Sequence, residues 1–147
     1  MFRNILIPTD GSSLATVAVD AAVAFAKEVG ANITVFTVME PFHLFTSSSY
    51  QLGSTREEYE ALSREHAAQT LAAAQAQAER AGVACATDQV RSHEVFRAII
   101  QKAEDIGADL IVMASHGRSG VGALIVGSVT AKVLTHSTIP VLVYRKK

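Results

Sequence analysis

The sequence has a single cysteine, Cys85, so it can form neither a disulfide within the chain nor a metal site built from several cysteines. No apolar run approaches the roughly 18 residues of a membrane span, and the apolar stretch at the N-terminus is too short for a signal peptide. The formal net charge of -1 gives no electrostatic reason to expect nucleic acid or an anionic membrane as a partner. We therefore expect a cytoplasmic protein.

The composition is that of one globular domain. A chain of 147 residues with 49% hydrophobic and 18% charged residues can build its own core, and we expect a single domain over residues 1–147. The neighbours of Cys85, which are Val83, Ala84 and Ala86, favour a small buried hydrophobe over a reactive thiol at this position.

Strand and helix patterns alternate from end to end. Strands are expected at Asn4–Pro8 and at residues 31–38, 83–90, 109–114 and 139–144. Helices are expected between them: one capped by Ser12 or Ser13 and ended by Gly30, and others at residues 55–81, 93–106 and Ser128–His136. Apolar strands alternating with helices predict an α/β fold, a doubly wound open parallel sheet with helices on both faces.

Residues 39–54 show no clear periodicity, and a connection of this length is uncommon in a compact domain. Phe42, Phe45 and Tyr50 lie within it. Two interpretations remain open: the segment is a lid over a ligand or partner, or it is an insertion whose aromatic residues pack on their own domain.

The stretch MASHGRSGVGALIVGS, residues 113–128, contains four glycines and no acid. A dinucleotide-binding G-x-G-x-x-G that starts at Gly120 and Gly122 would need glycine where Ile125 stands. A Walker A loop from Gly122 to Gly127 would need lysine next, but Ser128 follows. Both familiar phosphate-binding patterns fail.

The position of the stretch still suggests an anion site. Gly117 follows a predicted strand, at the edge where ligands bind in open α/β sheets. Gly127 and Ser128 open the last helix, whose free N–H groups and dipole favour an anion. The alternative is that Ser128 simply caps this helix. The residues alone leave both interpretations open.

The order Ala114-Ser-His-Gly117, nine residues, then Gly127-Ser128 resembles the nucleotide-binding signature of the universal stress protein family, Gly-x2-Gly-x9-Gly-Ser/Thr. The segment ILIPTDGS resembles the family's first strand and loop, and SVTAKVLTHSTIPVLVYR resembles its last helix and strand. The resemblance spans essentially the whole chain. It implies a five-stranded sheet of order 3-2-1-4-5, in which the loops after Pro8 and Met113 flank one crevice.

The resemblance also implies an ATP site. Pro8, Thr9 and Asp10 would line the nucleoside, and the Asp10 carboxylate would accept from ribose hydroxyls or hold a metal, Mg²⁺, near the phosphates. Val38 would meet the adenine edge through its backbone. Met113 and Ala114 would lie near the ribose.

The phosphates would be bound by residues further along the signature, with Gly117, Gly127, Ser128 and Val129 giving backbone and hydroxyl donors. Arg118 is a candidate contact of the outer phosphates, and a solvated surface arginine is the alternative. The signature's first glycine is Ala114 here. If this position requires a positive φ or a very close approach of the ribose, the added methyl group would weaken binding.

His116 lies within the signature, but no nucleophile with an evident base partner accompanies it, and hydrogen bonding inside the loop is favoured over catalysis. The leading hypothesis is an ATP-binding stress-response regulator, more a binding protein than an enzyme. The alternatives are slow ATP hydrolysis with a metal on Asp10, and a nucleotide-free interaction module. A homodimer through the last strand, between Ile139 and Tyr144, is compatible with each of these, and the downstream partner is unknown.

Overall fold

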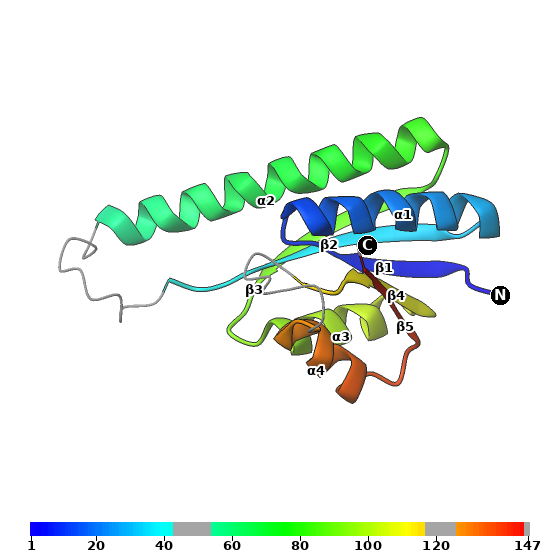
Figure 1. Ribbon diagram of the computed structural model, residues 1–147. Helices are drawn as coiled ribbons and strands as arrows, with labels where there is room; N and C mark the ends of the chain where they lie inside the picture. Colours follow the sequence, from blue (N-terminus) through cyan, green and yellow to red (C-terminus); the bar gives the residue numbers. More distant parts are fainter. Residues whose placement is uncertain (43–53, 117–125, 146–147) are drawn as a thin grey trace.

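Nine helices and strands alternate along the computed structural model, which describes residues 1–42, 54–116 and 126–145 (Figure 1). The strands are β1 (Asn4–Pro8), β2 (Asn32–Met39), β3 (Cys85–Arg91), β4 (Leu110–Ala114) and β5 (Val141–Tyr144). The helices are α1 (Ser13–Val29), α2 (Ser54–Ala81), α3 (Val95–Asp105) and α4 (Ser128–His136). The predicted alternation is confirmed.

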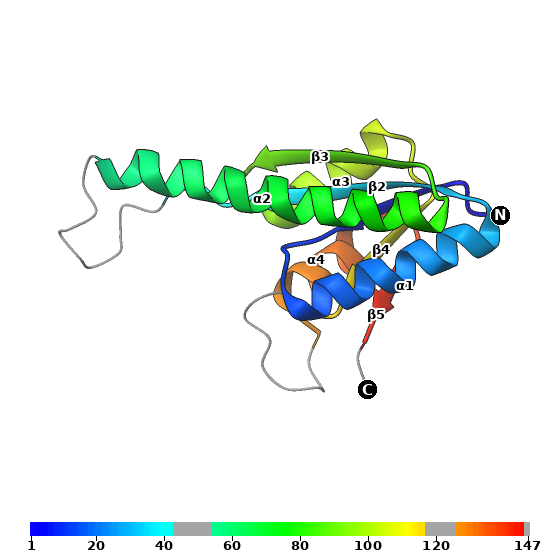
Figure 2. The same ribbon diagram turned by 90° about the horizontal axis from the view of Figure 1, so that it is seen from above.

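The five strands pair in parallel in one sheet, in the order β3-β2-β1-β4-β5. At its centre, Ile5 of β1 lies opposite Ile33 of β2 on one side and Leu110 of β4 on the other. β3 and β5 lie at the two edges (Figure 2). The order of the strands reverses between β1 and β4, so the predicted topology and its switch point are confirmed.

Helices cover both faces of the sheet, α1 and α2 one face and α3 and α4 the other (Figure 1). Successive side chains of a strand point to opposite faces, and β1 therefore serves two cores. Ile5 and Ile7 are buried against α1 and α2, and Leu6 is buried against α3 and α4. This two-sided burial explains why the central strands have continuous apolar runs instead of alternating ones.

Local signals set the ends of α1 as the sequence predicts. The Ser12 hydroxyl accepts from the amide of Ala15 at 3.3 Å and caps the first turn. Gly30 ends the helix in the left-handed conformation, with φ 70°, and a glycine adopts this conformation at little cost.

β3 departs from the prediction because it is an edge strand. It begins at Cys85 instead of residue 83, and the residues between Cys85 and Arg91 are exposed. Cys85 is only half-buried against the core, so the prediction that its side chain is buried was wrong. Its partial burial raises the pKa of the thiol. The exposed residues include the polar run Thr87-Asp88-Gln89, as suits a strand at the edge of the sheet.

The other boundaries differ from the prediction by one or two residues, the ordinary uncertainty of element ends. β5 starts at Val141 and not at residue 139, because Pro140 has no N–H to give to a ladder, although its carbonyl accepts from Ile111 at 2.9 Å. α3 begins at Val95, two residues later than expected. β1 and α4 have the predicted bounds.

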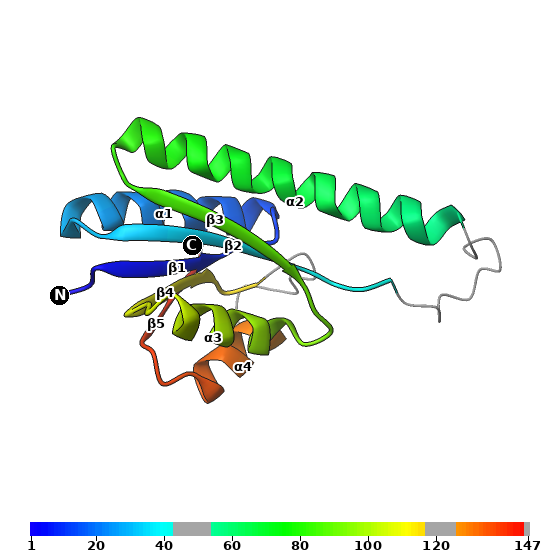
Figure 3. The same ribbon diagram turned by 180° about the vertical axis from the view of Figure 1, so that it is seen from behind.

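α2 extends well beyond the sheet that it covers. Its 28 residues span about 42 Å at 1.5 Å per residue, whereas the eight residues of β2 span only about 26 Å. The first half of α2 therefore projects past the carboxyl ends of the strands (Figures 1 and 3). Among the helices in the described part of the chain, even this long one is not apolar enough to cross a membrane.

Candidate functional site

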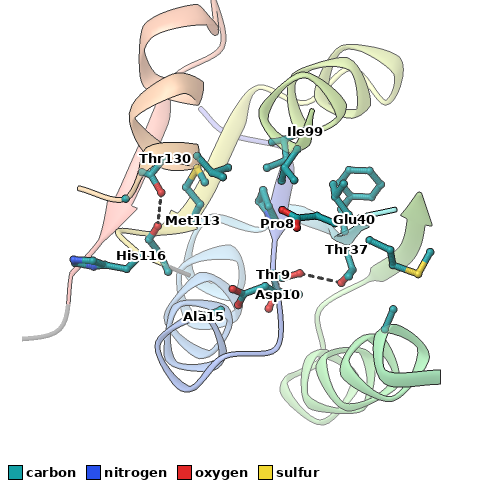
Figure 4. Close-up of a pocket in the computed structure, with 18 of the residues that line it drawn as sticks. Pro8, Thr9, Asp10, Ala15, Thr37, Glu40, Ile99, Met113, His116 and Thr130 are labelled. Carbon is teal, nitrogen blue, oxygen red and sulfur yellow. Dashed lines mark hydrogen bonds between the residues drawn. The ribbon is translucent and has the colours of Figure 1, made fainter. Parts of the chain in front are cut away.

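A pocket of about 730 Å³ opens at the carboxyl ends of β1, β2 and β4, where the strand order reverses. This is the place where open α/β sheets bind ligands. Figure 4 shows Thr37 and Glu40 on one side of the pocket, Thr130 and His116 on the other, and Thr9 and Asp10 between them. We call these two sides the β2 end and the α4 end.

Hydrogen bonds hold the loop after β1 beside the pocket. Buried Thr9 donates its amide to the Phe36 carbonyl at 2.9 Å, and its own carbonyl accepts from the Thr37 hydroxyl at 3.0 Å. One carboxylate oxygen of Asp10 accepts from the amide of Ser12 at 2.9 Å. The Asp10 side chain thereby lines the pocket in a fixed position.

Gly11 allows this loop to pass close under α2. Its φ is +76°, and a Cβ atom here would lie 2.7 Å from the Thr70 hydroxyl and 3.1 Å from Nε2 of His66. Glycine is therefore required both for the backbone conformation and for the contact with α2. Gly11 was not among the predicted site residues.

At the α4 end, hydrogen bonds join the end of β4 to the start of α4. The amide of Gly127 donates to the Ser115 carbonyl at 2.6 Å, and the Thr130 hydroxyl donates to the Ala114 carbonyl at 2.9 Å. A Cβ atom on Gly127 would approach the Ser115 carbonyl oxygen to 3.0 Å, so the close backbone contact requires glycine although φ is an ordinary −58°. The first turn of α4 is thus fixed beside the pocket.

Ser128 is the first residue of α4 and not its cap. The cap position belongs to Gly127, which has no side chain to bond the helix amides. The interpretation of Ser128 as the N-cap is therefore wrong. Its exposed side chain lines the pocket at the helix N-terminus, together with Val129.

Ala114 is accommodated without backbone strain, because no residue other than glycine has a positive φ in the described part of the chain. The residue is buried and belongs to a small cluster with Ala15 and Ala18 of α1. In this chain the position therefore does not adopt a positive φ. Its methyl group packs against two small side chains of α1.

The His116 ring is turned outward from the pocket (Figure 4). Its Nδ1 lies 2.7 Å from the hydroxyl of Ser115, which is buried. This contact is the hydrogen bond within the loop that the sequence favoured over a catalytic role.

The structure brings most of the predicted site residues around this one pocket: Pro8, Thr9, Asp10, Val38, Met113, Ala114, Gly127, Ser128 and Val129. Gly117 and Arg118 lie outside the described residues, as does most of the segment 39–54 for which a lid was considered. The wall that the first half of α2 contributes was not predicted, and it includes Tyr59, Leu62, Ser63 and His66. The available signal was the length of the predicted helix, which exceeds that of any strand.

The charged carboxylate side chains that line the pocket are negative. Asp10 and Glu40 are its carboxylates, and no lysine or arginine is found among the lining residues that the structure describes. Within the same residues, no group of three or more His, Cys, Asp or Glu side chains could hold a metal ion.

The comparisons with known proteins agree with this architecture. The family model described as "Universal stress protein family" matches residues 1–145. Universal stress protein YxiE of Bacillus subtilis is 33% identical, over 99% of this chain and 100% of its own. Universal stress protein UspA from Lactobacillus plantarum is 26% identical, with a TM-score of 0.85 over 98% of each chain. A universal stress protein in complex with cAMP shares the fold, with 24% identity and a TM-score of 0.72 over 99% of each chain.

Proposed function

Because the chain belongs to the universal stress protein family, we propose that it is a regulatory protein that binds ATP with Mg²⁺ in the pocket between β1 and β4. The observation that carries the proposal is the junction of β4 with α4. There the first turn of a nine-residue helix faces the pocket, and its cap residue, Gly127, brings no side chain that could occupy the free amides. Such a turn suits a phosphate group.

The nucleoside would lie toward the β2 end. Val38 lines the pocket, as do Pro8, Thr9 and Met113. The Val38 backbone would meet the adenine edge. A universal stress protein of the same fold has been solved with cAMP, which supports an adenine nucleotide as the ligand class.

Asp10 has the chemistry for one of two roles in this complex. A carboxylate accepts from ribose hydroxyls, and it is also a common protein ligand of Mg²⁺ that is otherwise held by phosphates and water. The acidic lining favours the second role, because a polyphosphate beside Asp10 and Glu40 needs a cation to offset the repulsion.

A regulatory role agrees better with the site than hydrolysis does. His116, which lines the α4 end, points outward and is hydrogen-bonded to Ser115, so its geometry does not suit the orientation of an attacking water. We propose that ATP occupancy is the signal and that a protein partner recognises the occupied form.

We also propose a homodimer through β5. This strand is an edge of the sheet and pairs with β4 alone among the described strands, and Leu142 on it is 41% exposed. A second β5 would cover this apolar edge.

The test of ATP binding has two parts. Purified protein is denatured and its supernatant is examined for nucleotide by ion exchange, and nucleotide-free protein is then titrated with ATP in a calorimeter, with Mg²⁺ or with EDTA. We expect Mg²⁺-dependent binding that Ser128→Ala weakens. Thr135→Ala is the control, because this exposed residue lies at the far end of the same helix. The absence of both carried-over nucleotide and heat of binding would refute the proposal.

A further inference from the structure

The first half of α2 is nearly detached from the core although it forms a wall of the pocket. The buried residues of α2 come later in the helix: Ala67, Leu71, Ala74 and Ala78. Between residues 56 and 66, all of which the structure describes, only Glu60 and Ser63 are even half-buried. A short helical segment is marginal in water, because helices in proteins gain most of their stability from tertiary packing. Another contact must therefore hold this segment.

Arg91, at the end of β3, makes this contact. One terminal nitrogen of its guanidinium group donates to the Glu40 carbonyl at 3.1 Å. The other donates to the Ser63 hydroxyl at 3.0 Å and to the Glu60 carbonyl at 3.4 Å. A planar guanidinium group can serve several acceptors at once, and a lysine ammonium cannot reproduce this fork. The two half-buried residues of the segment are thus the two that Arg91 bonds.

Neighbouring contacts complete this junction. The amide of Ser92 donates to the Met39 carbonyl at 2.9 Å, which continues the pairing of β3 with β2 past their last ladder residues. The Tyr59 hydroxyl lies 3.5 Å from the Glu40 carbonyl, and its ring centroid is 5.5 Å from that of Phe42. Arg91 itself bonds β3 to α2 and to Glu40, the residue that follows β2.

We propose that Arg91 is a positioning residue that holds the first half of α2 as the wall of the pocket's β2 end. The proposal rests on the proposed function, because it assigns that wall to the nucleoside part of the ligand. Tyr59, Ser63 and His66 line the pocket from this wall, while the phosphate groups would lie at α4. Loss of Arg91 should therefore weaken the binding of AMP, ADP and ATP by one common factor.

The experiment compares wild-type protein with Arg91→Gln, Arg91→Lys and Ser63→Ala by calorimetric titration with AMP, ADP and ATP in the presence of Mg²⁺. We expect Arg91→Gln to raise all three dissociation constants about tenfold, the equivalent of about 1.4 kcal/mol for lost hydrogen bonds to a charged group. Ser63→Ala removes one partner, and Arg91→Lys keeps the charge without the fork, so both should give smaller increases. Arg97→Gln is the matched control, since Arg97 lies on α3 and its side chain is 69% exposed.

Amide hydrogen exchange of the ligand-free proteins supplies the second measurement. Arg91→Gln should speed the exchange of residues 56–66 and leave the second half of α2 unchanged, because only the first half depends on this contact. A general loss of stability would instead speed exchange throughout the helix. Partial rescue by Arg91→Lys would also separate positioning from a folding defect.

Three outcomes overturn the inference. Unchanged exchange in residues 56–66 of Arg91→Gln would show that Arg91 does not hold the segment. Faster exchange with wild-type affinities would show that the wall does not contribute to binding. A loss of affinity in Arg91→Gln that grows from AMP to ATP would show that the wall contacts the phosphates and not the nucleoside. If the wild type binds none of the three nucleotides, the proposed function fails together with the ligand assignment, whereas the exchange measurement still decides the positioning role.

Discussion

The amide of Gly127 lies 2.6 Å from the carbonyl oxygen of Ser115, and this contact joins the end of β4 to the start of α4. It brings the helix N-terminus beside the sheet at the point where the strand order reverses. Two features of an anion site, free helix amides and a crevice at the switch point, are therefore combined by one backbone hydrogen bond.

Gly127→Ala should reduce ATP affinity about tenfold and lower the free energy of unfolding by about 1–2 kcal/mol. The added Cβ would approach the Ser115 carbonyl to 3.0 Å and the Cα of His116 to 3.3 Å, so the junction must open. Calorimetric titration and urea denaturation measure the two effects. Wild-type affinity in the variant would contradict the importance of this close contact.

Gly11→Ala should destabilise the protein more than Gly30→Ala does. Both glycines have a positive φ, so each substitution carries about 1 kcal/mol or more of backbone strain. Only at Gly11 does the new Cβ also meet α2, 2.7 Å from the Thr70 hydroxyl, whereas nothing lies within 4 Å at Gly30.

The combined variant Gly11→Ala/Thr70→Ala tests the cause of this difference. The double variant should be less destabilised than the sum of the two single variants, because the clash between the new Cβ and Thr70 is removed. Urea denaturation of the single and double variants measures this. Equal losses for Gly11→Ala and Gly30→Ala would mean that α2 moves aside without cost.

Ala114→Gly, which restores the first glycine of the family signature, should not improve ATP binding beyond about twofold. The alanine has no unfavourable φ, and its methyl group is buried against Ala15 and Ala18. We expect a loss of stability of about 1–2 kcal/mol, from the added freedom of glycine and the lost buried methyl group. A several-fold gain in affinity would show that the methyl group obstructs the ligand.

Asp88 should stabilise the folded protein at pH values above the ordinary pKa of aspartate, and this stabilisation should be lost in acid. The hydrogen bond from Lys102 is the main cause that lowers the pKa of Asp88 in the folded protein. A lowered pKa means that the contribution is lost as the pH falls through the folded-state value. The effect is small and weakened by salt, because the Asp88 side chain is 50% exposed.

This dependence is measured as the difference in unfolding free energy between wild type and Asp88→Asn over pH. The difference should be present at neutral pH and vanish in acid. Asp105→Asn is the control, because Asp105 accepts from the uncharged Gln101 at 2.9 Å. An unfolding free-energy difference that grows as the pH falls would contradict a lowered pKa of Asp88.

Leu142→Asp should convert the proposed dimer to a monomer in sedimentation experiments, because a charge on β5 would be buried in the paired edge. Val90→Asp is the matched control: Val90 is 39% exposed on β3, at the opposite edge of the sheet. A wild-type protein that sediments as a monomer at all concentrations would refute the dimer.

The parts of the fold that the sequence predicts well are those with local signals. β1 has its predicted bounds because it is a compact apolar run that ends at Pro8. α4 has its predicted bounds because Gly127 occupies the cap position in front of it. Cys85 was placed too deep because its apolar neighbours do not show that β3 is an edge strand. Burial depends on strand order, which no local pattern contains.

The site was predictable at the strand ends and not on α2. Asp10, Ala114 and Gly127 follow or end elements of the sheet, and the topology alone brings them together. Arg91 contacts Ser63, 28 positions away, through a helix that extends beyond the sheet. Nothing in the alanine-rich pattern of that helix indicates where it lies relative to β2.

The separation of α2 into a buried half and a projecting half also has an evolutionary consequence. Substitutions of exposed side chains usually change stability by no more than about 0.5 kcal/mol, so most side chains between residues 56 and 66 can diverge while the sheet and its core stay the same. Under the proposed roles of this wall and of Arg91, one scaffold can then acquire new ligand preferences through substitutions in the wall, provided that the contacts of Arg91 persist.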